Sequence, residues 1–170
     1  VAAAKNSLNN SFKVNKKLFE PYINEYSSLF GQKGSIASNI LRDDIQKESW
    51  KKIGPVRTAK GIKEMEDKIK KIEAMLNNIS IPNYFIWNQA FMDFVELKNM
   101  ICSAKLIGLA AKERNGSIGG HVRLDAKNIS IFSRPYSTVV HKNNNTYLVK
   151  KLNRTRTPLK NLIYYKILEK

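Results

Sequence analysis

Residues 88–125 read NQAFMDFVELKNMICSAKLIGLAAKERNGSIGGHVRLD and carry the strongest structural pattern in the chain. Apolar residues recur in it at steps of three and four, a spacing that places them on one face of an α-helix. They are Phe91, Phe94, Val95, Ile101, Ala104, Leu106, Leu109 and Ala110. We therefore predict one long helix. We expect it to end at Asn115 and Gly116, because both residue types tolerate the left-handed conformation found at helix C-termini.

A glycine-rich loop follows this helix and carries His121, Arg123 and Asp125 in strict alternation after Gly116, Gly119 and Gly120. Clustered glycines let backbone amides approach an anion, and His121 and Arg123 would add donors. The alternative is a turn that needs glycine for its backbone angles, with Arg123 and Asp125 in a structural ion pair. A motif this short does not by itself decide between a binding role and a structural role.

Two further helices are predicted upstream. Residues 35–53 have Ile36, Ile40, Ile45 and Trp50 as their expected apolar face, and Gly54-Pro55 ends the helix. Thr58 is expected to cap the next helix. Its apolar residues also recur by three and four, which predicts packing against a neighbouring helix, with a partner-binding zipper as the alternative. They are Ile62, Met65, Ile69, Ile72, Leu76 and Ile79. Residues 12–30 also show helical spacing, interrupted by Pro21.

After Asp125 the pattern changes to that of strands. Residues 136–141 and 146–151 are rich in β-formers and flank an Asn-rich turn, which predicts a hairpin. Residues 161–168 suit a third strand or a docked tail. The predicted fold is mainly α: a three-helix antiparallel bundle followed by a short C-terminal tail that contains a β-hairpin.

Composition narrows the classes of function. The chain has 170 residues, of which 42% are hydrophobic and 26% charged, as in globular proteins, and its net charge is +16. Such a charge favours polyanionic or acidic partners. The single cysteine, Cys102, is expected to be buried within the long helix. Neither His121 nor His141 has a second ligand at metal-binding spacing, so we expect no metal site.

The C-terminal tail mixes basic and aromatic residues, a combination that suits nucleic acid because lysines pair with phosphates and rings stack on bases. The residues are Tyr147, Lys150, Lys151, Arg154, Arg156, Lys160, Tyr164, Tyr165 and Lys166. The alternative is a solvated strand edge protected by lysines. No recognisable nucleic-acid-binding motif supports the first interpretation.

The long helix and its loop resemble the C-terminal helical domain of the succinate dehydrogenase and fumarate reductase flavoprotein superfamily, which includes L-aspartate oxidase. Residues 96–100 (ELKNM) and 110–114 (AAKER) resemble the family patterns ELxNM and AALxR. Arg57 takes the arginine position of the family segment VGxVR. Gly116 and Ile118 replace the glutamate and arginine of the family segment ESRGAHxRxD, whose other matched positions are Ser117, Gly119, His121, Arg123 and Asp125. The resemblance runs from about Ile40 to Asp125 and is thin beyond it.

The resemblance implies the C-terminal helical portion of a split or cleaved FAD-dependent flavoprotein, which docks on an FAD-carrying chain within an oxidoreductase complex. It implies no catalytic and no cofactor-binding residues here, because those of the family lie in its flavin and capping domains. FAD would be held by the companion chain, and this chain alone would not turn over substrate. The implied interface residues are Arg57, Ser117, Gly119, Gly120, His121, Arg123 and Asp125.

The resemblance also implies a division of the chain and a set of partners. Residues 1–11 would be the end of a preceding flavin domain or a linker, 12–125 the helical bundle, and 126–170 an extended or β tail. An iron–sulfur subunit is a second candidate partner; membrane contact would be indirect, and nucleic acid is not expected. The chain would lie in the cytoplasm, or on the cytoplasmic or matrix side of a membrane through its partners. The alternatives are a part of another superfamily member, such as L-aspartate oxidase, and a basic nucleic-acid-associated helical protein.

Overall fold

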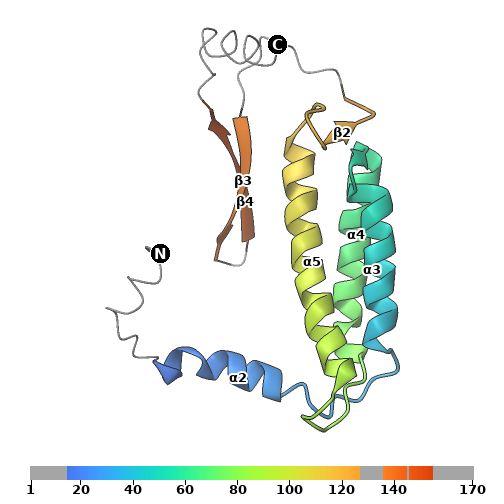
Figure 1. Ribbon diagram of the computed structural model, residues 1–170, viewed down its shortest axis with the longest axis vertical. Coiled ribbons are helices and arrows are strands. Elements are labelled where there is room, and N and C mark those ends of the chain that lie inside the picture. The colour runs from blue at the N-terminus through green and yellow to red at the C-terminus, as the bar shows by residue number, and fades with distance from the viewer. Residues whose placement is uncertain (1–14, 127–135, 145, 155–170) are drawn as a thin grey trace, which may run out of the picture.

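A computed structural model describes residues 15–126, 136–144 and 146–154 (Figure 1). Residues 1–11, for which we predicted the end of a flavin domain or a linker, lie outside the described residues, as do residues 161–168, for which we predicted a third strand or a docked tail. The elements, in chain order, are η1 (Lys16–Leu18), α2 (Glu20–Ser27), α3 (Ser38–Ile53), β1 (Val56–Arg57), α4 (Ala59–Met75), η2 (Leu76–Asn78), α5 (Gln89–Glu113), β2 (Val122–Arg123), β3 (Tyr136–Asn143) and β4 (Thr146–Asn153).

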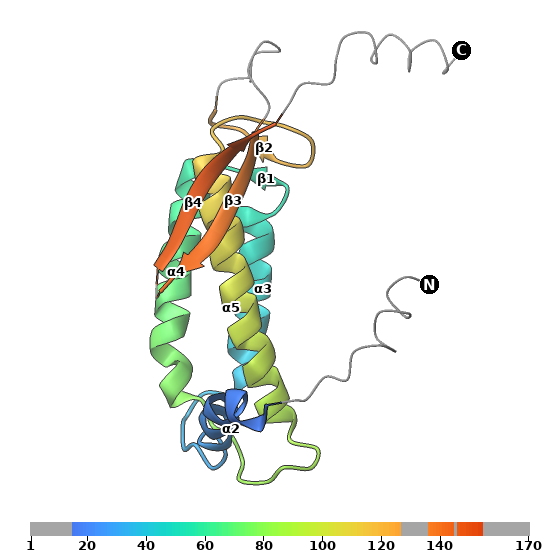
Figure 2. The same cartoon turned by 90° about the vertical axis from the view of Figure 1, so that its left-hand side faces the viewer.

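The helices α3, α4 and α5 form an antiparallel bundle, and the predicted fold class is confirmed. Figures 1 and 2 show the three helices side by side, with α2 at one end and β1 and β2 at the other. Their shared core is aliphatic, with one phenylalanine and one methionine at its centre. Its buried residues are Leu41, Ile45, Ile53, Ile62, Met65, Ile69, Ile72, Ile79, Ile81, Phe94, Leu97, Ile101, Ala104 and Ala111.

The apolar seam of α4 packs inside the bundle, as its spacing predicts. Ile62, Met65, Ile69 and Ile72 are all buried against α3 and α5. Thr58 caps the helix, because its hydroxyl accepts the Gly61 backbone N–H at 3.0 Å. The seam is therefore occupied within this chain, and the zipper alternative is not needed.

The apolar face predicted for α3 is wrong in part. Ile40 and Trp50 are exposed, whereas Leu41 and Ile45 are buried. At 100° per residue, Ile40 and Ile45 lie roughly 140° apart around a helix and do not share a narrow stripe, whereas Leu41 and Ile45 are roughly 40° apart. The steps of five residues from Ile40 to Ile45 and from Ile45 to Trp50 do not keep side chains on one face of an α-helix.

Two expectations for the long helix α5 also need correction. The helix ends at Glu113, and Arg114 follows it with φ −88° and ψ 95°, so the chain leaves in an extended rather than a left-handed conformation. Cys102 is exposed rather than buried. It neighbours the buried Ile101, and adjacent helical residues point roughly 100° apart. At the other end Asn88 caps the helix by accepting the Phe91 backbone N–H at 3.0 Å.

At the end of the bundle that carries α2, residues 34–36 run alongside residues 78–80, and Ile36 and Ile79 form a parallel β-bridge. The Ile36 backbone N–H donates to the Asn78 carbonyl at 3.1 Å, and the Ser80 N–H donates to the Ile36 carbonyl at 2.9 Å. The neighbouring Gly34 has no room for a side chain, because a Cβ there would overlap the backbone of Asn78 and Ile79. Glycine therefore lets these two segments meet and bury Ile79 beneath them.

The predicted hairpin is confirmed. Strands β3 and β4 pair antiparallel, with Tyr136 opposite Asn153 and Asn143 opposite Thr146. The hairpin lies along α5 (Figure 2), and Arg114 fixes one end of it by donating to the Tyr136 carbonyl at 2.7 Å. Pro21 lies in the first turn of α2, where it starts a helix instead of kinking one. None of the described helices has the length and apolar character needed to cross a bilayer.

Candidate interface at the glycine turn

Two short strands at the end of the bundle bring together residues far apart in the sequence. β1 and β2 pair in parallel, with Arg57 opposite Arg123, and the Val122 N–H donates to the Pro55 carbonyl at 2.9 Å. β1 directly follows α3, and β2 follows α5 by the glycine-rich loop. Because the two strands lie side by side, the loop is tied to the junction between α3 and α4.

Arg123 is the centre of this junction and is 7% exposed. Its guanidinium binds both carboxylate oxygens of Asp125, at 2.8 and 3.2 Å. It also donates to the carbonyls of Ala111 and Arg114 at 3.2 and 3.3 Å, which lie at the C-terminal end of α5. A cation suits this position, because the carbonyls at a helix C-terminus carry partial negative charge.

Asp125 in turn joins the loop to the start of α4. Its carboxylate accepts the Ala59 backbone N–H, in the first turn of that helix, as well as the Arg123 guanidinium. The hydrogen bonds from Arg123, and then from Ala59, lower the pKa of Asp125 from 3.8 to about 2. The ion pair that the sequence offered as the structural alternative therefore forms, and it links α4, α5 and the loop.

His121 lies against Arg57 in the same network. The Arg57 guanidinium donates to Nδ1 of His121, and Nε2 of His121 lies 3.2 Å from the Arg114 carbonyl. Because arginine can only donate, this arrangement requires a neutral imidazole with its proton on Nε2. Burial lowers the pKa of His121 below 6.5, and the nearby arginines act in the same direction, while the hydrogen bond to the Arg114 carbonyl opposes them.

We expect this histidine to make the chain less stable as the pH falls below its ordinary pKa of 6.5. In that range the unfolded chain takes up a proton that the folded chain resists, so stability rises with pH and falls on acidification. Urea unfolding of the wild type between about pH 7 and pH 5 should show this loss, and His121→Gln should remove most of it. An unchanged slope in the variant would contradict a half-buried, neutral imidazole at position 121.

The outer side of the loop is a tight two-residue turn. Ile118 and His121 exchange backbone hydrogen bonds at 2.8 and 3.0 Å across Gly119 and Gly120. Gly119 has φ +54°, in the region that favours glycine, and a Cβ at either glycine would meet no atom within 4 Å. We call residues 118–121 the glycine turn. On the inside it is bounded by the bonded side chains of Arg57, His121, Arg123 and Asp125, which we call the arginine network, and on the outside it is open.

Exposed apolar side chains surround the glycine turn. Along β1 and the segment that follows β2, Arg57 and Arg123 point inward, whereas the alternate residues Val56 and Leu124 are exposed. Ile118, at the base of the turn, is 54% exposed. A rigid backbone that carries exposed apolar residues is typical of a protein interaction surface. We call Val56, Ile118, Gly119, Gly120 and Leu124 the turn surface.

The structure therefore brings together all seven residues that we predicted, but it separates them into two groups. Arg57, Ser117, His121, Arg123 and Asp125 bond to one another or to backbone atoms, and Arg123 at their centre is buried. Ser117, for example, accepts the Arg123 backbone N–H at 2.9 Å. Gly119 and Gly120 lie outside. The donors that an anion site would have used, on His121 and Arg123, are engaged within the chain.

Sequence reasoning missed two parts of this site. Arg114 was matched to the family pattern but not to a role, yet its carbonyl binds both His121 and Arg123, and its guanidinium lies 4.6 Å from the centre of the Tyr136 ring. Ala59 provides the backbone N–H for Asp125. Arg114 lies at the end of one predicted helix and Ala59 at the start of another. Helix ends leave backbone carbonyl and N–H groups without partners in the helix, and this was the signal that the sequence offered.

Other candidate chemistry finds little support in the part of the chain that the structure describes. In residues 15–126, 136–144 and 146–154, no three metal-ligating side chains of His, Cys, Asp or Glu come together. In the basic tail, Lys151 pairs with Glu113 at 2.9 Å and lies over the Tyr136 ring. These contacts within the chain favour a structural role for Lys151 over binding to phosphate. Arg156, Lys160 and Lys166 lie outside the described residues.

The fold and the arginine network define a helical domain that is closed at one end by a β-bridged loop. The same fold occurs in FrdA of the quinol fumarate reductase from E. coli, with a TM-score of 0.73, 18% identity, and coverage of 86% of this chain and 26% of that one. Residues 42–165 match the family described as fumarate reductase flavoprotein C-term. The chain belongs to this family and corresponds to the C-terminal domain of flavoproteins of the succinate dehydrogenase and fumarate reductase type.

Relatives with a described function agree with this assignment. One subunit of the fumarate reductase (CoM/CoB) of Methanothermobacter marburgensis is 26% identical over 125 residues, which are 74% of this chain and 23% of the relative. The 8-methylmenaquinol:fumarate reductase flavoprotein subunit of Wolinella succinogenes is 30% identical over 86 residues, or 50% of this chain and 14% of the relative. The chain thus spans less than a quarter of either relative. The family match also continues past Asp125, so the tail belongs to the family more clearly than its residues had indicated.

Proposed function

We propose that this chain docks through its turn surface on an FAD-carrying flavoprotein chain and completes a fumarate reductase or succinate dehydrogenase type of flavoprotein. In that assembly a dicarboxylate would exchange hydride with the flavin, and an iron–sulfur subunit would be a further partner. Residues 12–125 would form the docking unit and 126–170 a tail that leads back toward the partner. Contact with a membrane would come only through partners. The isolated chain would not turn over substrate.

One observation supports this proposal above the others: the turn surface is fixed from within and open on the outside. The charged groups of the arginine network are already bonded to other groups of the chain, so they are not available to hold a ligand. A partner would contact the bare backbone at Gly119 and Gly120. It would also contact the exposed apolar side chains of Val56, Ile118 and Leu124. A pre-ordered surface of this kind loses little conformational entropy on binding, which favours docking on another protein.

The position of the glycine turn also supports FAD on the companion chain. A dinucleotide site needs its glycines between a strand and the N-terminus of a helix, where backbone N–H groups attract the pyrophosphate. Here the glycines follow the C-terminus of α5, whose carbonyls face the loop through Arg123. That end of a helix repels an anion. The glycine turn therefore does not fit the pyrophosphate of FAD.

Binding to the companion chain tests the proposal. The natural complex is purified gently, its FAD-carrying chain is isolated, and its affinity for this chain is measured by calorimetry. We expect Ile118→Asp to weaken binding by about tenfold or more, because a carboxylate would be buried without a partner. Ile40→Asp is the matched control, since Ile40 is 62% exposed on α3 and lies outside the turn surface. Equal affinities for the two variants would contradict docking at the turn surface.

A further inference from the structure

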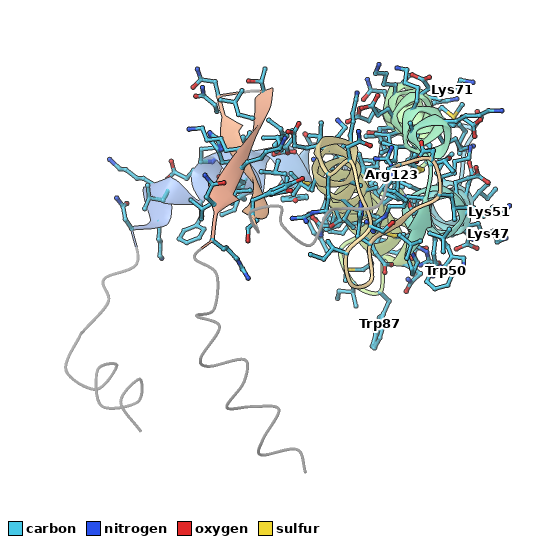
Figure 3. The ribbon with its side chains drawn as sticks, turned by 90° about the horizontal axis from the view of Figure 1, so that it is seen from above. Lys47, Trp50, Lys51, Lys71, Trp87 and Arg123 are labelled. Atoms are coloured by element: carbon cyan, nitrogen blue, oxygen red, sulfur yellow. The ribbon has the colours of Figure 1, made fainter. Side chains whose placement is uncertain are left out.

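A second exposed apolar feature lies at the opposite end of the bundle. Residues 84–87 (YFIW), which we call the Trp87 loop, join η2 to α5, and all four side chains are exposed. Trp87 is 94% exposed and has a φ of +58°, a conformation that costs a residue with a side chain roughly 1–2 kcal/mol. Seen along the bundle in Figure 3, the Trp87 side chain stands out from the body of the molecule.

The Trp87 loop is rigid despite its exposure. Asn88 is buried and donates to the carbonyls of Pro82 and Tyr84 at 2.9 and 2.8 Å, while its side-chain oxygen caps α5. The Phe85 ring packs against Phe30 with 4.3 Å between ring centres. The Gln89 N–H bonds to the Trp87 carbonyl at 3.0 Å. A strained residue persists only where its surroundings fix it, and such residues concentrate at binding sites.

Charge indicates what kind of partner the Trp87 loop fits. The chain has 30 lysines and arginines, yet no charged residue occurs between Glu73 and Asp93. A surface for nucleic acid or anionic lipid would carry basic residues beside its aromatic ones. A rigid, uncharged loop with a tryptophan at its tip instead suits an uncharged apolar pocket on another protein, where tryptophan is a frequent source of affinity.

We propose that the Trp87 loop is a second docking point for the FAD-carrying chain, and that this partner offers an uncharged apolar pocket for the Trp87 indole. The inference rests on the proposed function. The two docking points are separated by the length of α5, whose 25 residues extend about 37 Å.

The size of the relatives allows one partner to reach both points. In the M. marburgensis relative the matched 125 residues are 23% of the chain, so the remainder is roughly 420 residues, with a radius of gyration of about 22 Å. A body of that size is wider than α5 is long. Contacts at both ends would act together, so the loss of one weakens binding without abolishing it.

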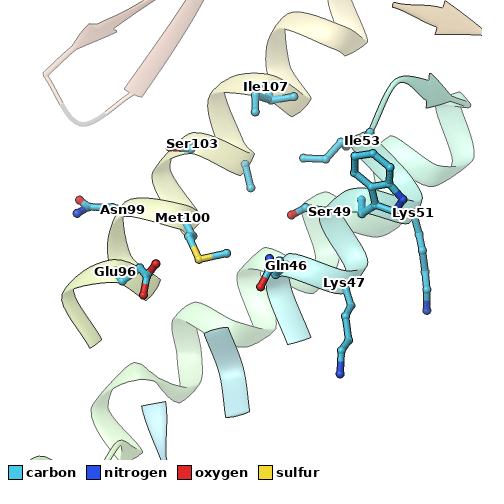
Figure 4. Close-up of a pocket in the computed structure, with 13 residues that line it drawn as sticks. Gln46, Lys47, Ser49, Lys51, Ile53, Glu96, Asn99, Met100, Ser103 and Ile107 are labelled. Atoms are coloured by element: carbon cyan, nitrogen blue, oxygen red, sulfur yellow. The ribbon is translucent and has the colours of Figure 1, made fainter. Parts of the chain in front are cut away.

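The experiment measures binding of the FAD-carrying chain to four forms of this protein: wild type, Trp87→Ala, Trp87→Asn and Trp50→Ala. Trp50 is the matched control, because it is 74% exposed and borders a groove of about 820 Å³ between α3 and α5 (Figure 4). We expect Trp87→Ala to raise Kd about 30-fold and Trp50→Ala to change it less than about threefold. Equal effects of the two alanine variants, with a wild type that binds, would overturn the inference and leave the proposed function standing.

Stability separates lost binding from lost folding. Asparagine tolerates a positive φ, so Trp87→Asn should raise the melting temperature of the free chain by about 2 °C while it weakens binding as Trp87→Ala does. If Trp87→Asn both lowered the melting temperature and weakened binding, the inference would be overturned, because Trp87 would then stabilise the fold of the free chain. No binding by the wild type would overturn the proposed function and this inference together.

Fluorescence distinguishes a protein pocket from other occupants. In Trp50→Phe, Trp87 is the single tryptophan of this chain. After the companion's own emission is subtracted, binding of the FAD-carrying chain should shift the Trp87 emission to the blue and protect it from acrylamide. The same shift with phosphatidylcholine vesicles alone, or on self-association of this chain at higher concentration, would overturn the inference in favour of a lipid surface or a second copy.

Discussion

Arg123→Ala is expected to destabilise the chain by about 3 kcal/mol, because it removes a buried cation that satisfies three separate acceptors. The Asp125 carboxylate would lose its bidentate partner, the Ala111 carbonyl would lose its Arg123 donor, and the Arg114 carbonyl would keep only His121. The loop would then be tied to the bundle by the pairing of β1 with β2 and by the remaining hydrogen bonds of His121 and Asp125. Urea unfolding at pH 7, with the free energy extrapolated to water, measures the effect.

Two further variants test whether the loss of stability is specific to the bonds of Arg123. Arg154→Ala removes an exposed arginine and should change stability by less than about 0.5 kcal/mol. Arg123→Lys keeps the charge but cannot bind both carboxylate oxygens and two carbonyls at once, so it should fall between the wild type and the alanine variant. A loss below about 1 kcal/mol in Arg123→Ala would mean that the network does not hold the loop.

Gly34→Ala is expected to cost about 3 kcal/mol or more, through the backbone rather than a side chain. The new Cβ would overlap the carbonyl of Asn78, so residues 34–36 and 78–80, which run side by side, would have to separate. Their two backbone hydrogen bonds, between Ile36 and residues 78 and 80, would be lost, and the buried Ile79 would be displaced. Thermal unfolding followed by circular dichroism measures the loss.

Gly108→Ala is the matched control and should have the opposite sign. Gly108 lies within α5, and a Cβ there meets no atom within 4 Å. Alanine has the higher helix propensity, so this variant should gain up to about 1 kcal/mol. Opposite effects of the two glycine-to-alanine substitutions would confirm that residues 34–36 pack closely against residues 78–80. Small effects of similar size would contradict this close packing.

The helices and the hairpin could be predicted from the sequence because local patterns determine them. The seam of α4, its cap at Thr58 and the alternating residues of the hairpin each predict a structure that the fold confirms. The buried face of α3 could not be predicted in the same way, because its isoleucines are unevenly spaced and are compatible with more than one apolar face of the helix. Packing against α4 and α5 buries Leu41 and exposes Ile40.

The candidate site was predictable in its residues but not in its arrangement. Family resemblance selected Arg57 and the residues from Ser117 to Asp125, yet Arg57 and His121 are 64 positions apart and meet only because β1 and β2 pair. Local sequence carries no signal for that pairing. The rigidity of the Trp87 loop also depends on a long-range contact, the packing of Phe30 against Phe85. The roles of both regions as interfaces stay predictions.

Native mass spectrometry of the gently purified complex tests whether this chain works as part of a flavoprotein. The visible spectrum of the same sample is recorded alongside. We predict one copy of this chain with one copy of a companion that carries a dinucleotide-binding glycine motif, and flavin absorbance that stays with the pair. A flavin-free monomer without a companion would contradict this role.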